Sequence, residues 1–265
     1  MISLRNIVVT FGLGTPLETQ ALRSVDLDIE KGEFVTVIGS NGAGKSTLLN
    51  VLSGEVLADS GHLQIDNEEL TRRPTHARAN LVARVFQDPL AGTCEQLTIE
   101  ENLALASARG RRRSLRRALN PQLRERFREQ LERLGLGLED RLGDRMGLLS
   151  GGQRQAVSLL MASLQPARIL LLDEHTAALD PKTAAFVLQL SNEIIHEHHL
   201  TTLMVTHSMR QALDVGTRTV MMHQGRIIFD VAGKERRGLD VPDLLALFEK
   251  RQGETLSDDS LLLSG

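Results

Sequence analysis

The chain has 265 residues, of which 41% are hydrophobic and 25% are charged, a composition typical of one large globular domain or of a domain with an inserted subdomain. A net charge of −3 and the absence of Trp and Tyr argue against a nucleic-acid-binding protein. The single cysteine, Cys94, excludes an intramolecular disulfide and fits a reducing compartment. Because we find no signal-peptide pattern and no apolar run long enough to span a membrane, we expect other chains to supply any membrane-embedded part.

The N-terminal part predicts a sheet that contains a strand, a glycine-rich turn and a helix in succession. Alternating apolar and polar residues predict strands over 2–11 and 21–29, and residues 33–39 predict a short apolar strand. The segment 45–54 predicts a helix that Gly54 ends. Two more strands are predicted over 61–70 and 79–87.

The turn between the third strand and the first helix has the sequence GSNGAGKST, which matches G-x-x-x-x-G-K-[ST] in the context that this motif requires. Glycines allow backbone N–H groups to surround phosphates, Lys45 adds positive charge at the β- and γ-phosphates, and the Ser46 hydroxyl is placed for Mg²⁺. We therefore predict a phosphate-binding loop made of Gly39, Ser40, Asn41, Gly42, Ala43, Gly44, Lys45, Ser46 and Thr47.

The middle of the chain, residues 88–165, predicts a helical insertion. Thr98 and Glu101 form a capping-box pattern at the start of one helix. A second helix over 121–135 places four apolar residues on one face, namely Leu123, Phe127, Leu131 and Leu134. Six arginines between Arg109 and Arg117 could contact nucleic acid or lipid headgroups, but a solvated helix face is the favoured interpretation.

Strands and helices alternate again in the C-terminal part, which indicates a parallel α/β core. We predict strands over 168–173 and 200–207, helices over 181–199 and 241–250, and an exposed hairpin over 218–231 that turns at Gln224 and Gly225. The predicted organisation is one domain over 1–250, with a core of 1–87 and 166–250, the helical insertion of 88–165, and a polar tail over 251–265.

Two further segments contain candidate functional residues. In ILLLDE, residues 169–174, Asp173 follows a buried strand at the edge where α/β sheets bind ligands, so it would hold the Mg²⁺ shell, and Glu174 would polarise a water for attack on the γ-phosphate. In LLSGGQRQAV, residues 148–157, a serine and two glycines precede a helix and make a second anion cradle.

GSNGAGKST, LLSGGQRQ, ILLLDEHTAALD and TH, in this order, resemble the ATP-binding cassette ATPase family over residues 1–250. The resemblance implies an α/β fold with a P-loop NTPase core and parallel sheet, an N-terminal antiparallel β subdomain and a helical insertion. It also implies a head-to-tail dimer in which the LSGGQ signature of one copy binds the ATP of the other, which explains the second cradle. The signature residues are Ser150, Gly151, Gly152 and Gln153, and ATP hydrolysis would open the dimer.

Other family positions carry over one at a time. Phe11 lies where the family places an aromatic residue that stacks on adenine, although a core Phe is the alternative. Gln87 matches the glutamine that contacts Mg²⁺ and the attacking water, and the alternative is a surface glutamine. His207 matches the histidine that orients Glu174 and that water, and the alternative is a capping or core histidine. Asp180 matches the loop that crosses the dimer interface.

The chain departs from the common family pattern after the proposed base. Most relatives have Pro where this chain has His175, and Ser where it has Ala178. His175 could tune the pKa of Glu174 or touch the partner subunit, but the favoured interpretation is a neutral variation on a surface turn.

The resemblance therefore implies the ATPase subunit of a membrane transporter that uses ATP and Mg²⁺ and imports a small, amino-acid-like solute. Its expected partners are a second cassette, permease subunits that dock near Gln87 and residues 89–98, and a solute-binding protein, at the cytoplasmic face of the inner membrane, with no nucleic acid. The alternatives are a soluble cassette ATPase acting on DNA or ribosomes, and a module that binds ATP without hydrolysis. The compact insertion and the single cassette argue against the first, and intact Glu174 and His207 argue against the second.

Overall fold

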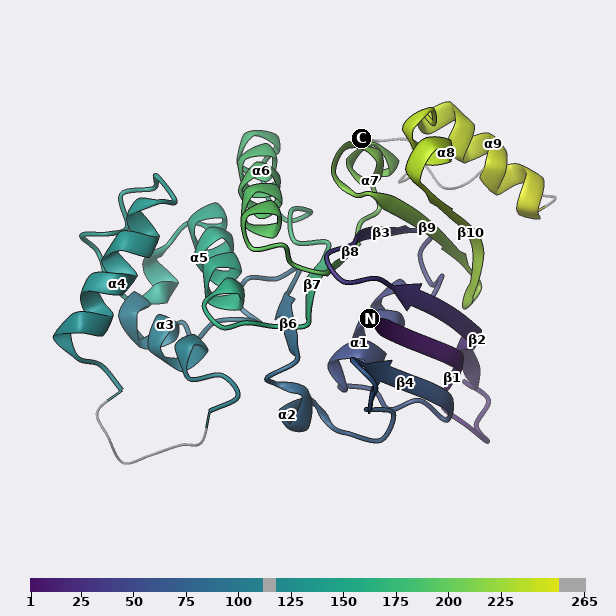
Figure 1. Cartoon of the computed structure of the whole chain (residues 1–265), viewed down its shortest axis with the longest axis horizontal. Helices are drawn as coiled ribbons and strands as arrows, with labels where there is room; N and C mark the ends of the chain where they lie inside the picture. Colours follow the sequence, from purple (N-terminus) through teal and green to yellow (C-terminus); the bar gives the residue numbers. More distant parts are fainter. Residues whose placement is uncertain (112–117, 253–265) are drawn as a thin grey trace. The chain divides into compact units, whose positions relative to one another are not determined.

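The computed structural model describes residues 1–111 and 118–252 (Figure 1). The predicted tail lies outside this range from residue 253 on, as do residues 112–117 of the arginine run. In the described ranges, no helix is long and apolar enough to cross a membrane. The chain divides into two compact units, Met1–Arg78 with the chain from Leu200 onward (the first unit) and Ala79–His199 (the second unit). This division does not follow the predicted subdomain boundaries, which stay a prediction.

The first unit contains the predicted antiparallel N-terminal sheet. Its strands are β1 (Ile2–Phe11), β2 (Thr19–Ile29), β4 (Ser60–Ile65) and β5 (Glu68–Glu69), in the order β2-β1-β4-β5. Asn6, with φ of 50°, interrupts β1 and shifts its register against β2, so that Leu4 and Ile7 both point into the core. The single strand predicted over 61–70 is a hairpin instead, because Asp66 and Asn67 both adopt positive φ and turn the chain.

The second sheet of the first unit contains β3 (Phe34–Ile38), β8 (Thr202–Val205), β9 (Arg218–His223) and β10 (Arg226–Ala232). Strand β3 lies between β8 and β9 and is parallel to both, and β9 forms a hairpin with β10 through Gln224 and Gly225. The prediction of an exposed hairpin is wrong for β9, where Val220, Met221 and Met222 are fully buried. Pairing with a central parallel strand places β9 inside the core.

The helices of the first unit include the one that directly follows the turn after β3. They are α1 (Lys45–Ser53), α2 (Thr75–Arg78), α7 (Met209–Val215), α8 (Gly233–Arg237) and α9 (Val241–Gln252). Gly54, with φ of 80°, ends α1 as predicted. The buried guanidinium of Arg78 donates to the carbonyls of Val51 and Leu52 at the end of α1, so these acceptors have partners away from water.

The second unit combines two parallel strands with the predicted helices. Its elements are β6 (Val82–Val85), α3 (Ile99–Ser107), α4 (Pro121–Glu132), the 3₁₀ turn η1 (Met146–Leu148), α5 (Gly151–Ser163), β7 (Ile169–Asp173) and α6 (Pro181–Glu197). The capping box of Thr98 and Glu101 forms as predicted. On the apolar face of α4, Phe127 and Leu131 are buried, and Arg124 joins α4 to Glu100 of α3 through two hydrogen bonds of 2.7 and 2.6 Å.

Candidate nucleotide site

The loop that joins β3 to α1 depends on two of its glycines. Gly39 has φ of 149°, and a Cβ there would lie 2.1 Å from the carbonyl oxygen of Met222. Gly44 has φ of 100°, and its Cβ would lie 2.6 Å from the carbonyl oxygen of Ala21. Gly42 also has a positive φ, of 74°, but nothing lies within 4 Å of its Cβ position. Close backbone approach therefore excludes side chains at both ends of the loop, while its middle is open.

Lys45 is the first residue of α1, and its side chain lies inside this loop. It is 5% exposed, and its Nζ donates hydrogen bonds to the carbonyl oxygens of Gly39 (2.6 Å) and Ser40 (3.0 Å). The N–H of Gly225 in the β9–β10 turn donates to the carbonyl of Ala43 (3.0 Å) and supports the loop from behind. A lysine held at a helix N-terminus within a glycine-rich loop is an arrangement that attracts phosphate.

His207 follows a strand that is adjacent to the strand preceding this loop. β3 and β8 are parallel neighbours with Val37 opposite Val205, so the residues after both strands leave the same edge of the sheet. The N–H of Thr206 donates to the Val37 carbonyl (3.1 Å), so the hydrogen bonding between the two strands continues for one residue beyond Val205, up to the residue before His207. The structure thus brings His207 and the phosphate loop together at the edge where α/β sheets bind ligands.

Phe11 is the last residue of β1, and its side chain is 44% exposed. The alternative of a core Phe is therefore wrong, because a core aromatic side chain would be removed from water. An accessible aromatic face is what stacking on a base requires.

The second unit also has two adjacent parallel strands, and predicted site residues follow both of them. Val85 of β6 lies opposite Leu172 of β7, so Gln87 and the Asp173–Glu174 pair leave neighbouring strand ends. Gln87 is exposed, while Asp173 and Glu174 are partly buried. These three predicted residues therefore lie at one edge of the sheet.

Arg84 is a residue of this edge that sequence reasoning missed. Its Nη2 donates to Oδ2 of Asp173 at 2.6 Å, and the two side chains are only 10% and 13% exposed. The guanidinium also lies 4.7 Å from the centre of the Phe86 ring. The signal in the sequence was an arginine within the apolar strand segment LVARV, since a charge there requires a partner.

The burial of His175 contradicts the prediction that it lies on a surface turn. Its side chain is buried, with 2% exposure, and its Nε2 lies 2.8 Å from the hydroxyl of Ser191 on α6. That hydroxyl donates its only hydrogen to the Val187 carbonyl (2.7 Å), so it accepts a hydrogen bond from the Nε2–H of His175. A residue buried in this way does not reach a partner subunit, and burial lowers the pKa of His175 from 6.5 to about 4.

We expect this burial to make the stability of the chain depend on pH. The folded-state pKa of about 4 lies below the ordinary 6.5, so the unfolded chain binds more protons between these values. The contribution of the neutral imidazole is therefore complete above pH 6.5 and is lost as the pH falls toward 4. Through this one group, the free energy of unfolding is expected to be about 2 kcal/mol lower at pH 5 than at pH 7.

Urea denaturation at pH 5 and pH 7, without nucleotide and with chelator, measures this dependence. The variant His175→Gln has no titratable group at position 175, and its other titratable groups are those of the parent, so its free energy of unfolding should change less between the two pH values by about 2 kcal/mol. If the free energy of unfolding changed equally with pH in parent and variant, His175 would not take up a proton on unfolding.

The signature residues begin α5, and Asp180 begins α6. Ser150 is the N-cap of α5 and accepts from the N–H of Gln153 (3.3 Å), while the Gln153 side chain returns a bond to the Ser150 N–H (3.2 Å). A Cβ on Gly152 would lie 2.0 Å from Cγ2 of Thr183, so a glycine allows α5 to approach α6. Asp180 caps α6, and its hydrogen bonds from Thr183 lower the pKa of its carboxyl group.

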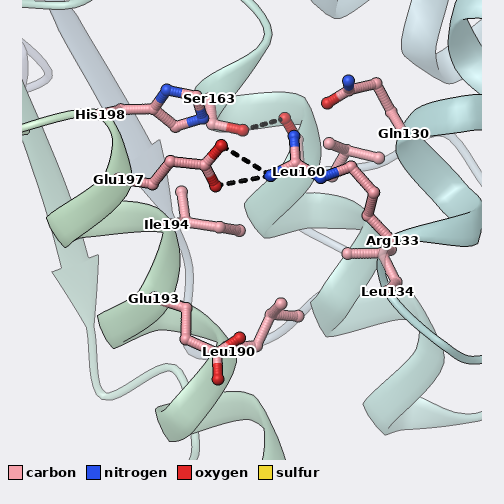
Figure 2. Close-up of a pocket in the computed structure, with 10 residues that line it drawn as sticks. All are labelled: Gln130, Arg133, Leu134, Leu160, Ser163, Leu190, Glu193, Ile194, Glu197 and His198. Atoms are coloured by element: carbon pink, nitrogen blue, oxygen red, sulfur yellow. Dashed lines mark hydrogen bonds and ion pairs between the residues drawn. The ribbon is translucent and has the colours of Figure 1, made fainter.

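A separate pocket lies at the ends of α4, α5 and α6 (Figure 2). Leu134, Leu160 and Leu190 line it together with an ion pair at the rim, in which Nη2 of Arg133 lies 2.6 Å from each carboxylate oxygen of Glu197. Both charged side chains are about half exposed, so the ion pair contributes little to stability. With a volume of about 60 Å³, the pocket holds no more than a few water molecules and includes none of the predicted site residues.

Comparisons with known proteins agree with this geometry. A family model described as ABC transporter matches residues 22–177. The chain is similar to the tyrosine transport ATP-binding protein of Clostridioides difficile (strain R20291), with 43% identity over 94% of this chain and 99% of the relative. It is 36% identical to the thiamine import ATP-binding protein of Yersinia pseudotuberculosis, over 77% of this chain and 82% of the relative. The solved dimeric structure of a bacterial ABC transporter cassette has a TM-score of 0.76 at 30% identity, covering 90% of this chain and all of the other.

Proposed function

The chain belongs to the ABC transporter family, whose cassettes bind and hydrolyse ATP, and we propose that it energises the import of a small, amino-acid-like solute. The observation that carries this proposal is the 43% identity to a tyrosine transport ATP-binding protein over nearly the full length of both chains. The relative named for thiamine import supports the direction of transport.

In the proposed site, the first unit binds the nucleotide. Backbone N–H groups of residues 39–47 surround the phosphates, and the Lys45 ammonium exchanges its two loop carbonyls for phosphate oxygens. Phe11 stacks on the adenine. His207 contacts the γ-phosphate and orients the attacking water.

Magnesium fits the donors that the chain offers. Ser46 has an exposed hydroxyl and Asp173 a carboxylate, and oxygen ligands are those that Mg²⁺ prefers. Arg84 occupies one oxygen of Asp173, and an ionised carboxylate retains further lone pairs for the ion or its bound water. We propose that Ser46, Asp173 and Gln87 hold the ion, which neutralises charge on the phosphates when bound.

Hydrolysis in this proposal needs no covalent intermediate. Glu174 accepts the proton of a water that attacks the γ-phosphate in line, and Lys45 stabilises the charge that develops. The signature residues, Ser150 to Gln153, bind the ATP of a second cassette, and Asp180 lies at that interface. ATP would therefore favour the closed dimer, and loss of the γ-phosphate would favour the open one.

The proposed partners are a second cassette, permease subunits and a solute-binding protein, with the cassette peripheral to the cytoplasmic face of the inner membrane. Permease docking is proposed at residues 89–98. In this segment the Leu90 side chain is 40% exposed, and Cys94 is an exposed free cysteine.

The single cysteine of the chain allows a direct test. A thiol-reactive photocrosslinker on Cys94, activated in native membranes, should join the chain to a polytopic membrane protein, and Cys94→Ser should abolish the product. Gentle solubilisation should also recover a solute-binding protein, and that protein, when loaded with tyrosine, should stimulate the ATPase of the reconstituted complex. Recovery of only ribosomal or DNA-bound partners would leave the ATPase in place and overturn the transport proposal.

A further inference from the structure

The backbone of Glu174 adopts a conformation that L-amino acids rarely take. Its φ is +43°, in the left-handed region, although it carries a long, charged side chain. Such a conformation costs free energy and persists only where the surrounding structure holds it. The conformation of this one residue also sets the direction in which its side chain leaves the end of β7.

Residues on both sides of Glu174 make short contacts. On the N-terminal side, Arg84 binds the Asp173 carboxylate at 2.6 Å. On the C-terminal side, the imidazole of His175 is bonded to Ser191 at 2.8 Å. The turn is closed by a hydrogen bond of 2.9 Å from the N–H of Ala177 to the Glu174 carbonyl.

We propose that His175 is a positioning residue for Glu174, which it holds in its left-handed conformation by anchoring the following turn to α6. This inference rests on the proposed role of Glu174 as the base. The anchor lies 16 residues further along the chain, on the buried face of α6, where Ser191 is 1% exposed and Val187 is fully buried.

The direction of the hydrogen bonds explains why a donor is needed at position 175. Because the Ser191 hydroxyl donates to the Val187 carbonyl at 2.7 Å, it can bond only to a group that brings its own hydrogen. A glutamine at position 175 can place an N–H near the position of Nε2, whereas alanine cannot. His175→Gln is therefore the conservative variant, and His175→Ala and Ser191→Ala remove the anchor from its two ends.

The test is single-turnover ATP hydrolysis and ATP affinity, measured for the three variants in the full-length chain. His175→Ala and Ser191→Ala should each slow hydrolysis by at least about 10-fold with ATP affinity within about two-fold of the parent, because displacement of a catalytic group by a fraction of an ångström affects the chemical step. His175→Gln should remain within about three-fold of the parent. A rate for both anchor variants equal to that of the parent would overturn the inference.

A double-mutant cycle with Glu174→Gln separates positioning from general loss of structure. If His175 acts through Glu174, then His175→Ala should cause no further loss once the base is removed. A full 10-fold loss in the Glu174→Gln background would mean that His175 acts elsewhere and would overturn the inference. If Glu174→Gln alone hydrolysed ATP at the parent rate, the proposed function of Glu174 would fail instead. Should His175→Ala fail to fold, Ser191→Ala, which removes only one hydroxyl, gives the same cycle.

Discussion

Glu174→Gln is expected to slow ATP hydrolysis by at least about 100-fold while ATP affinity stays within about two-fold of the parent. The substitution keeps the size and polarity of the side chain but removes the carboxylate that accepts the proton of the attacking water, and such a base contributes about 10²- to 10⁴-fold to the rate. The phosphate loop and Lys45 are unchanged. Because ATP then remains bound, an ATP-dependent dimer should accumulate, which light scattering coupled to gel filtration would detect.

The matched control for this prediction is Glu132→Gln, the same chemical change at an exposed position near the end of α4. It should leave the hydrolysis rate, ATP affinity and oligomeric state as they are in the parent. The assignment of the base is wrong if the two variants hydrolyse ATP at similar rates. A stable ATP dimer of the Glu174 variant with a normal rate would separate dimer closure from chemistry and would move the role of base to another group.

The parts of the site that could be predicted are those in which a short segment determines its own geometry. The spacing of Gly39, Gly44 and Lys45 specifies a loop, the serine of the signature caps the helix that follows it, and Asp173 ends an apolar strand. In each case neighbouring residues supply both the backbone conformation and the functional groups. A pattern over fewer than ten residues therefore contains most of the information.

Features that depend on distant partners could not be predicted in this way. His175 stands among polar and small residues, which suggested a surface turn, and its burial depends on Ser191 on a later helix. The burial of β9 depends on its pairing with β3, from which it is separated by most of the chain. Arg84 pairs with Asp173 across two strands that lie far apart in the sequence. Tertiary contacts decide these features, and local patterns do not record them.

Two alanine substitutions in the phosphate loop should have very different effects, although both replace a glycine with positive φ. In Gly39→Ala the new Cβ would lie 2.1 Å from the Met222 carbonyl oxygen, so the backbone of the loop or of β9 must move. That movement displaces the Gly39 carbonyl, which accepts a hydrogen bond from Lys45. We expect ATP affinity to fall by at least about 100-fold, which corresponds to about 2.7 kcal/mol.

In Gly42→Ala nothing lies within 4 Å of the new Cβ, so only the strain of a positive φ of 74° remains. That strain costs about 1–2 kcal/mol, and we expect a loss of affinity of about 10-fold or less. Calorimetric titration with ATP in the Glu174→Gln background measures both variants without hydrolysis, and thermal unfolding checks that both are folded. Equal losses would mean that the loop depends on glycine only for its φ angles. A selective loss at Gly39 would show that the close approach of β9 shapes the loop, so residues outside the motif would help to determine ATP affinity.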